Sequence, residues 1–444
     1  MDRLLFEKGA AESSAPPEIV AGKPRLRVPQ RDQVELQCSA LDELLEPDHR
    51  ARLVWAAVSG LPLAGWLSEI RAVEGHVGRD ATDPRLLVAL WVYATLDAVS
   101  SARELARLCE TQAAYRWLCG GVSVNYHLLA DFRSRGGARW DELLTQLVAA
   151  LLAEGLVTMQ CVAQDGMRVR AGAGRSSFRR APTLEQLQKD AQEHLDRLKK
   201  EAESAADRQD GDARRKAAKD RAARERKERV DEAVRQHKEL ADQREQRKKG
   251  EGVKTRCSTT DPDARNMKTP SGGFEPAYNV QFATDADTRV IVGVDVTNEG
   301  SDADELPPML DTVEADYGKR PEVALVDSAF ATKDSVTEAE RGGTTVVSTI
   351  KHGERLEKNG KDPHSPQRGD TPEFIAFRAR MADPKYKELY KTRPSVAEFP
   401  NAVCRNQNLR QFNVRGLLKA KAVALWHALA FNFRRLPHLL AGQT

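Results

Sequence analysis

The sequence predicts a helical N-terminal domain followed by an α/β domain with a mixed sheet, and a charged helical hairpin interrupts the second domain. Three observations predict this architecture. Residues 31–155 carry apolar side chains at helical spacing, residues 183–250 are highly charged, and segments after residue 250 alternate with period two. The length of 444 residues is about three times the commonest domain size, which also favours more than one structural unit.

Composition excludes several classes of protein. The longest apolar run, residues 86–96, is far shorter than the roughly 20 residues that cross a bilayer, so we expect no membrane span. Residues 1–30 lack the layout of a signal peptide and are expected to form a flexible tail. The six cysteines show no C-x-x-C spacing, which fits reduced thiols and favours a cytoplasmic protein. The net charge of +3 does not by itself indicate a nucleic-acid partner.

The N-terminal domain is predicted from helix-capping signals and apolar periodicity. Asp83 and Pro84 form a cap and a first-turn proline before a mostly buried helix over residues 85–96. Ser101 and Glu104 have the spacing of a capping box, and residues 123–132 and 141–156 continue the helical pattern. Short helices joined by tight turns suit a helix-turn-helix DNA reader, but a helical bundle without a nucleic-acid role has the same pattern. Candidate DNA contacts in this domain are Tyr126, His127 and Arg133, with helix packing as the alternative for Tyr126 and His127.

The second unit begins where residues 158–169 change in character, with a short β-prone apolar stretch that ends in Asp165 and Gly166 and predicts a strand. Residues 183–250 then keep leucine and alanine at three-four spacing, which predicts a coiled-coil seam. Asp210-Gly211-Asp212 interrupts the seam and favours two helices folded back as a hairpin. The alternative is a solvated charged helix that acts only as a spacer.

The remaining elements are predicted from alternation and composition. Two period-two segments flank a turn at Asp285-Ala-Asp287, which predicts a β-hairpin. A helix over residues 301–317, two short strands over 322–327 and 344–350, and a mainly helical end over 383–440 complete the α/β unit.

Asp165 and Asp327 each follow an apolar strand in this prediction. Carboxylates at strand ends project into the crevice where ligands collect, and hard oxygen donors suit Mg²⁺ or Mn²⁺. Glu398 is the candidate for a third acid, because Arg405 lies seven residues further along and would share its face of a helix. A single aspartate after a strand is also a common turn former, which is the alternative for either aspartate alone.

Positive charge is concentrated beside two of these acids. The 46 residues from Phe399 to Thr444 contain seven Lys or Arg and no Asp or Glu, which favours a phosphate-binding surface. The cations of this stretch are Arg405, Arg410, Arg415, Lys419, Lys421, Arg434 and Arg435. A second basic cluster follows Asp165 and consists of Arg168, Arg170, Arg175, Arg179 and Arg180. A solubilising surface is the alternative, although it explains the lack of acids poorly.

Several motifs together resemble the DDE transposases of bacterial insertion sequences, from about residue 31 onward. Besides V-A-Q-D-G at Asp165, they are S-T-T-D-P-D-A (258–264), A-Y-N-V-Q (277–281), V-D-S-A-F (326–330), Tyr390, Arg393 and Glu398 in a Y-R-E signature, and V-R-G-L-L-K (414–419). This resemblance implies an RNase H-like catalytic domain over residues 156–182 and 251–440. It also implies that residues 31–155 bind transposon ends and that residues 183–250 are a charged helical hairpin inserted after the first catalytic strand.

The resemblance implies a reaction as well. Two Mg²⁺ or Mn²⁺ ions held by Asp165, Asp327 and Glu398 would activate water at the transposon end and then present the freed 3′-OH to target DNA. Partners would be double-stranded DNA and further copies of this chain, in the bacterial cytoplasm and at the nucleoid when bound to DNA. Tyr390 would support the site or pack in the core. Phosphate contacts are expected from Arg168, Arg393, Arg405, Arg410, Arg415 and Lys419.

The sequence departs from the family pattern near Glu398. The usual signature has three residues between arginine and glutamate, whereas four separate Arg393 and Glu398. Pro400 would fall inside the helix that carries Glu398, where a proline costs on the order of 3 kcal/mol. We therefore expect Glu398 to sit in an irregular segment, and we hypothesise that this copy is catalytically impaired.

Three other functions fit parts of the sequence. A DNA nuclease of the same fold would cut without joining, and a repurposed copy would bind DNA without cutting. A coiled-coil scaffold is disfavoured because residues 183–250 lie between the two aspartates and not at a terminus.

Overall fold

The structure is a computed structural model that describes residues 38–73, 75–76, 80–204, 213–269 and 272–441. The tail predicted over residues 1–30 and the interruption at Asp210-Gly211-Asp212 lie outside the described residues. Within the described part of the chain, no helix is long and apolar enough to cross a membrane. All six cysteines are free, as predicted.

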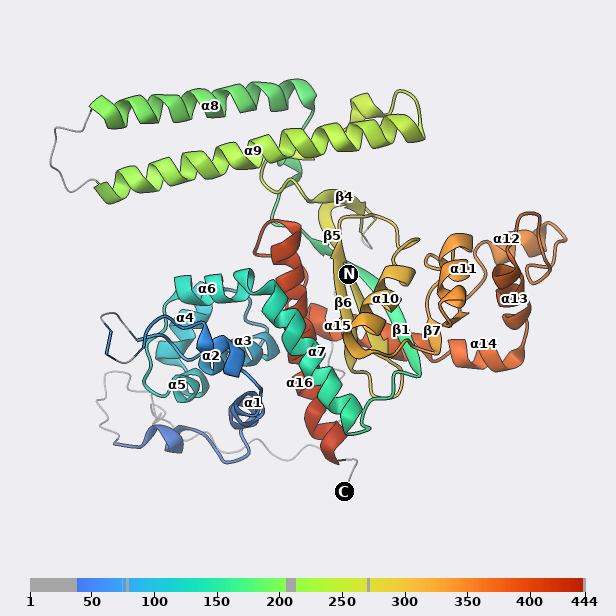
Figure 1. Ribbon diagram of the computed structural model, residues 1–444, viewed down its shortest axis with the longest axis horizontal. Helices are drawn as coiled ribbons and strands as arrows, with labels where there is room; N and C mark the ends of the chain where they lie inside the picture. The colour runs from blue at the N-terminus through green and yellow to red at the C-terminus, as the bar shows by residue number, and fades with distance from the viewer. Residues whose placement is uncertain (1–37, 74, 77–79, 205–212, 270–271, 442–444) are drawn as a thin grey trace, which may run out of the picture. The chain divides into compact units, whose positions relative to one another are not determined.

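The N-terminal part is helical, as predicted (Figure 1). Asp83 accepts a hydrogen bond from the backbone N–H of Arg85 at 2.8 Å and caps α3. Ser101 accepts from the backbone N–H of Glu104 at 3.4 Å and caps α4, which confirms one half of the predicted capping box. The elements here are η1 (Leu41–Leu44), α1 (Arg50–Ser59), α2 (Ala64–Ser68), α3 (Pro84–Leu96), α4 (Ala102–Thr111), α5 (Ala113–Cys119), α6 (Tyr126–Arg135) and α7 (Gly137–Ala153).

The charged segment forms two long helices, α8 (Ala181–Ser204) and α9 (Ala213–Arg247), which lie side by side and antiparallel (Figure 1). Gln188 of α8 donates a hydrogen bond to Asp231 of α9 at 2.8 Å. The helical hairpin is therefore confirmed. Short elements connect it to the sheet: η2 (Arg175–Ser177), β2 (Phe178–Arg179), η3 (Gly252–Lys254) and β3 (Cys257–Ser258), with β2 and β3 paired antiparallel.

Six strands of the described chain form a mixed sheet in the order β4-β5-β1-β7-β8, with β6 pairing the same side of β5 as β4. The pairs β1–β5, β4–β5 and β5–β6 are antiparallel, whereas β1–β7 and β7–β8 are parallel. The β5–β6 pair confirms the predicted hairpin, and the arrangement is the expected RNase H-like fold. The strands are β1 (Cys161–Arg170), β4 (Arg265–Lys268), β5 (Phe274–Asp285), β6 (Ile291–Thr297), β7 (Val323–Leu325) and β8 (Thr345–Val347).

Two predicted helix boundaries differ in the structure. The helix predicted from residue 301 begins at Leu306, because Pro307 favours the first turn of a helix. The helical end of the chain is broken between residues 406 and 417, where Asn408 and Gly416 both have positive φ. The helices are α10 (Leu306–Tyr317), α11 (Lys333–Arg341), α12 (Gly353–Lys358), α13 (Pro372–Arg380), α14 (Pro384–Tyr390), the π-helical turn η4 (Pro394–Glu398), α15 (Phe399–Asn406) and α16 (Leu417–Ala441).

The helix α16 joins the N-terminal helices and the sheet into one hydrophobic core. It packs against α3, α6, α7 and β6, and Trp426 lies 4.5 Å from Trp140 of α7 between ring centroids. A smaller apolar cluster contains the strands β7 and β8 with α10, α11 and α13. Because most of the first half of α16 is buried, packing already explains part of the lack of acids in the C-terminal stretch.

Candidate active site

Asp165 and Asp327 lie at the same level of the sheet on neighbouring strands. The parallel pairing of β1 with β7 ends with Ala163 opposite Leu325. Each aspartate comes two residues after the last paired residue of its strand. Both carboxylates therefore lie where the parallel pairing ends, which is the edge of an α/β sheet that commonly binds ligands.

The prediction that the first strand ends at Asp165 and Gly166 is wrong. The strand β1 continues to Arg170, because its other edge pairs antiparallel with β5 from Val162 onward. A Cβ atom on residue 166 would lie 2.6 Å from both Asp302 Oδ1 and Gln281 Nε2. Glycine is needed at this position because polar side chains approach the backbone, and not because the chain turns.

We expect Gly166→Ala to lower the free energy of unfolding by about 1–3 kcal/mol, because the added methyl group must displace Asp302 and Gln281. Urea unfolding measures this change. Gly65→Ala in α2 is the control, since a Cβ there meets nothing within 4 Å and alanine favours a helix. A loss of the same size in both variants would contradict the assignment.

Arg168, predicted to bind DNA, lies on the face of β1 opposite to Asp165 because strand side chains alternate. Its Nη2 atom is 2.9 Å from Asp302 Oδ2, and both side chains are 15% exposed. Burial acts to raise the pKa of Asp302, but hydrogen bonds from Arg168, Asn279 and Gln281 bring that pKa below its ordinary value. The structure thus pairs Arg168 with Asp302 and does not bring it to the acids.

Glu398 reaches the aspartates through the π-helical turn η4. In a π-helix the residue on the next turn is five positions along, whereas in an α-helix it is three or four. Arg393 and Glu398 therefore face the same side, with Arg393 Nη1 3.6 Å from Glu398 Oε1. The extra residue in the Y-R-E signature is accommodated by this turn.

The irregular segment predicted at Glu398 is confirmed, and Pro400 follows it directly, with helical backbone on both sides. The helix α15 begins at Phe399, so Pro400 falls in its first turn. Backbone N–H groups of a first turn have no partner within an α-helix, so a proline is tolerated there.

The guanidinium of Arg393 lies among all three acids. Its Nη2 atom is 3.0 Å from Asp165 Oδ1 and 4.0 Å from Asp327 Oδ2, in addition to the contact with Glu398. The side chains of Arg393 and Asp165 are 9% and 17% exposed, so this ion pair is shielded from solvent more than surface pairs are. Three acids predicted from three motifs are thus brought together around the positive charge of Arg393.

Asp165 is the most buried of the three carboxylates. Burial raises the pKa of Asp165 to about 6, with repulsion from Asp327 and Glu398 adding to the rise and attraction to Arg393 opposing it. Asn401, which the sequence did not single out, also opposes the rise by donating a hydrogen bond to Asp165 Oδ2 at 2.9 Å. The sequence feature that could have identified Asn401 is its position three residues after Glu398, on the adjoining helical turn.

The three carboxylates fit Mg²⁺ or Mn²⁺ in donor type, because both ions prefer oxygen ligands. The side chains of Asp327 and Glu398 are 40% and 61% exposed, so their oxygens are accessible from solvent. Among the described residues, no three His, Cys, Asp or Glu side chains lie close enough together to hold a metal ion as they stand. In this arrangement Arg393 balances part of the negative charge of the acids.

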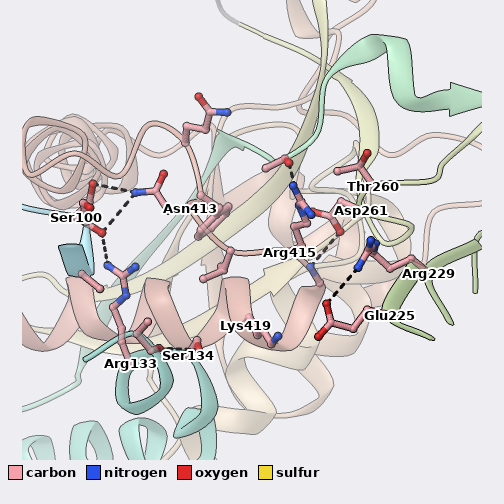
Figure 2. A pocket seen from close by; sticks show the side chains of 18 of the residues that line it. Ser100, Arg133, Ser134, Glu225, Arg229, Thr260, Asp261, Asn413, Arg415 and Lys419 are labelled. Carbon is pink, nitrogen blue, oxygen red and sulfur yellow. Dashed lines mark hydrogen bonds and ion pairs between the residues drawn. The ribbon is translucent and has the colours of Figure 1, made fainter. Parts of the chain in front are cut away.

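The other predicted site residues lie around the acids or away from them. Tyr390 ends α14 and packs partly buried against the smaller apolar cluster. Arg405 lies in the last turn of α15, whose N-cap is Glu398, and Arg410 is exposed in the loop that follows. Arg415 and Lys419 line a different cavity, shown in Figure 2, whose lining includes none of the three acids.

A cavity of about 920 Å³ adjoins the acids and was not predicted. Ser328, the residue after Asp327, lines it together with Tyr390. Its cationic lining residues are Arg355, Lys358, Lys387 and Lys391. This group of cations does not stand out in the sequence, because Glu354, Glu357 and Glu388 are interleaved with them.

Two protein families match parts of the chain. Residues 248–433 match the family described as "Transposase DDE domain", and this range includes Asp327, Arg393 and Glu398. Residues 39–135 match the family described as "Transposase domain (DUF772)", which spans the helices η1 to α6. Asp165 lies outside both matched ranges. No curated protein and no solved structure matches the chain.

Proposed function

The chain belongs to the insertion-sequence DDE transposases, and we propose that it cleaves a phosphodiester bond at each transposon end and joins the freed 3′-OH to target DNA. The observation that carries this proposal is the meeting of Asp165, Asp327 and Glu398 around Arg393. Three carboxylates from distant parts of the chain would not gather at one sheet edge for stability alone, because like charges repel there.

Asp165, Asp327 and Glu398 would hold the two Mg²⁺ or Mn²⁺ ions. When bound, such ions lower the pKa of water and stabilise charge on the attacking and leaving oxygens. Arg393 holds the carboxylates near one another before the ions bind, and it would contact the scissile phosphate. Asn401 orients Asp165, and together with Arg393 it favours the ionised carboxylate.

DNA contacts are proposed for the cations Arg405, Arg410, Arg415 and Lys419, and for Tyr390 and the neighbouring cationic cavity near the acids. Phosphate contacts of this kind give sequence-independent affinity that weakens with salt. For Arg168 we propose a supporting role through Asp302, because its guanidinium is already paired.

Each part of the chain has its own proposed role. We propose that residues 31–155 bind the transposon end, that residues 156–182 and 251–440 carry the chemistry, and that residues 183–250 form an inserted coiled-coil hairpin. The protein would act in the bacterial cytoplasm as a homo-oligomer on two ends, because each end needs its own set of acids.

Cleavage and strand transfer on labelled DNA that carries the element's ends tests this function. Asp165→Asn, Asp327→Asn and Glu398→Gln keep side-chain shape and remove charge, so we expect each to bind DNA but neither cut nor join it. Cutting without joining by the wild type would support a nuclease instead. Binding without cutting, with either metal, would overturn the enzymatic proposal in favour of a repurposed DNA-binding protein.

Pro400→Val is expected to change cleavage by less than about twofold, because Pro400 lies in the first turn of α15, directly after the π-helical turn, where a proline is tolerated. Initial cleavage rates of the two proteins provide the comparison. A large gain in rate for the valine variant would show that Pro400 impairs this copy.

A further inference from the structure

A cavity of about 1040 Å³ opens between parts of the chain that are distant in sequence. Its walls come from the start of α4 and from α6, from α9, and from the loops at residues 260–262 and 411–416. Figure 2 shows Arg133, Arg229 and Arg415 around it, each on a different one of these segments. The cavity therefore brings together the N-terminal helices, the charged hairpin and the catalytic domain.

Cations outnumber acids in this cavity, since five of its described lining residues are cationic and three are acidic. Arg103, Arg415 and Lys419 are exposed, and no ion pair joins them to an acid within the described residues. Two of the acids are already engaged. Glu225 lies 3.9 Å from Arg229, and Asp261 is fully buried, with Oδ1 accepting a hydrogen bond from Tyr278. The third acid, Glu228, is exposed, so the exposed charge of the cavity is positive on balance but not free of acids.

The cations of the catalytic domain are fixed in place by two aspartates. Asp261 accepts a hydrogen bond from the backbone N–H of Gly416, and Asp263 accepts one from that of Leu417, both at 3.0 Å. These bonds anchor the first turn of α16, which carries Lys419 and begins two residues after Arg415. This anchoring gives the S-T-T-D-P-D-A and V-R-G-L-L-K motifs a common structural role.

The same loop is tied to the N-terminal helices. Asn408 and Asn413 donate hydrogen bonds to Ser100 Oγ at 3.0 and 3.1 Å. Ser100 lies two residues before α4, whose second residue is Arg103. Arg103 and Arg415 therefore belong to segments that are held together before any ligand binds, which reduces the ordering that binding requires.

Aromatic rings extend the cationic surface. Arg103 lies 5.1 Å from the ring centroid of Tyr126, whose ring is in turn 4.0 Å from that of His127. His127 is exposed and Tyr126 is half-buried, so neither ring is committed to the core. Arg133 differs, because it is 8% exposed and donates to the backbone oxygen of Ser100 at 2.7 Å.

We propose that this cavity binds the phosphodiester backbone of duplex DNA at the transposon end. Arg103 of the N-terminal helices, Arg229 of the hairpin, and Arg415 with Lys419 of the catalytic domain contact the phosphates together. The proposal rests on the proposed function and adds a site that is separate from the acids. Arginine, lysine, tyrosine and asparagine side chains are the groups that proteins use for phosphate and sugar contacts.

The test is the affinity for a labelled duplex that carries the element's end, measured by fluorescence anisotropy in EDTA at several KCl concentrations. The double variant R415A/K419A is expected to bind about tenfold more weakly at 150 mM salt. The dependence of its log K on log salt should be shallower by about 1.8, because each lost phosphate contact contributes about 0.9. Arg103→Ala and Arg229→Ala should each weaken binding about threefold.

Two further variants separate the cavity from overall charge. K248A/K249A removes the same charge from exposed residues just after α9, outside the cavity, and should leave binding within about twofold. Glu228→Gln removes an exposed acid from the cavity and should tighten binding about twofold, which loss of folding cannot imitate. Equal losses in the two double variants, or no gain with Glu228→Gln, would overturn the proposal.

Failure of this site and failure of the proposed function give different results. Binding in EDTA does not require the metal-dependent step. If the R415A/K419A variant binds DNA with full affinity and cleaves it normally, the proposed phosphate-binding role of the cavity is overturned and the proposed function stands. A wild-type protein that neither binds nor cleaves the end overturns both.

Discussion

Arg393→Ala is expected to reduce cleavage of the transposon end by at least about a hundredfold and to lower the free energy of unfolding by about 3 kcal/mol. The guanidinium contacts Asp165 at 3.0 Å, and both side chains are largely buried. Removing one partner of a buried ion pair leaves a carboxylate without compensation, which is strongly destabilising. The three acids would also repel one another without a central cation, so their arrangement for catalysis would be lost.

Arg393→Lys is the matched control, because it keeps the charge and loses the planar fork that reaches several carboxylates at once. We expect it to recover most of the stability and only part of the cleavage rate. Chemical denaturation and single-turnover cleavage at pH 8 measure the two effects. If Arg393→Ala retained both stability and cleavage, the central role of Arg393 would be refuted.

Most of the fold could be predicted from the sequence, because many of its helices and strands have strong local signals. The caps at Asp83 and Ser101 and the alternating strands around Asp285 all depend on neighbouring residues, and the structure confirms each of them. The strand boundary at Asp165 was wrong for a non-local reason. Only the pairing with β5, more than a hundred residues later, shows that Gly166 continues the strand.

The site was harder to predict because its geometry depends on a rare backbone conformation. In an α-helix, Arg393 and Glu398 would point about 140° apart, since five residues exceed one turn of 3.6. The π-helical turn brings them together, and it has no simple sequence signal beyond the prolines that flank it. Asn401 escaped notice because its partner, Asp165, is 236 positions away.

Charge counting succeeded in locating cations but not in identifying their partners. Arg168 and Lys421 were both counted as free charges, yet Arg168 pairs with Asp302 and Lys421 lies 3.0 Å from Asp295. Arg415 and Lys419 form no ion pair with an acid within the described residues. The difference depends on which strand or loop packs beside each cation, and this is fixed only in three dimensions.

Asp165→Asn is expected to stabilise the metal-free protein at pH 8 by about 1–3 kcal/mol while abolishing cleavage. Burial, with repulsion from Asp327 and Glu398, raises the pKa of Asp165 to about 6 from an ordinary value of 3.8. Between about pH 4 and pH 6 the folded protein therefore holds more protons than the unfolded chain does. Stability consequently falls as the pH rises through this window, and the loss persists above pH 6. A shift of about two pKa units corresponds to about 3 kcal/mol.

Thermal and urea unfolding in EDTA at pH 4 and pH 8 measure this effect, since a bound divalent cation would favour the ionised carboxylate. The asparagine variant should gain stability at pH 8 and show little change at pH 4. Asp327→Asn, at a side chain that is 40% exposed, is the matched control and should gain less. A loss of stability for Asp165→Asn at pH 8 would mean that the ion pair with Arg393 outweighs burial. The expected gain instead identifies Asp165 as a residue whose charge is kept for chemistry at the expense of stability.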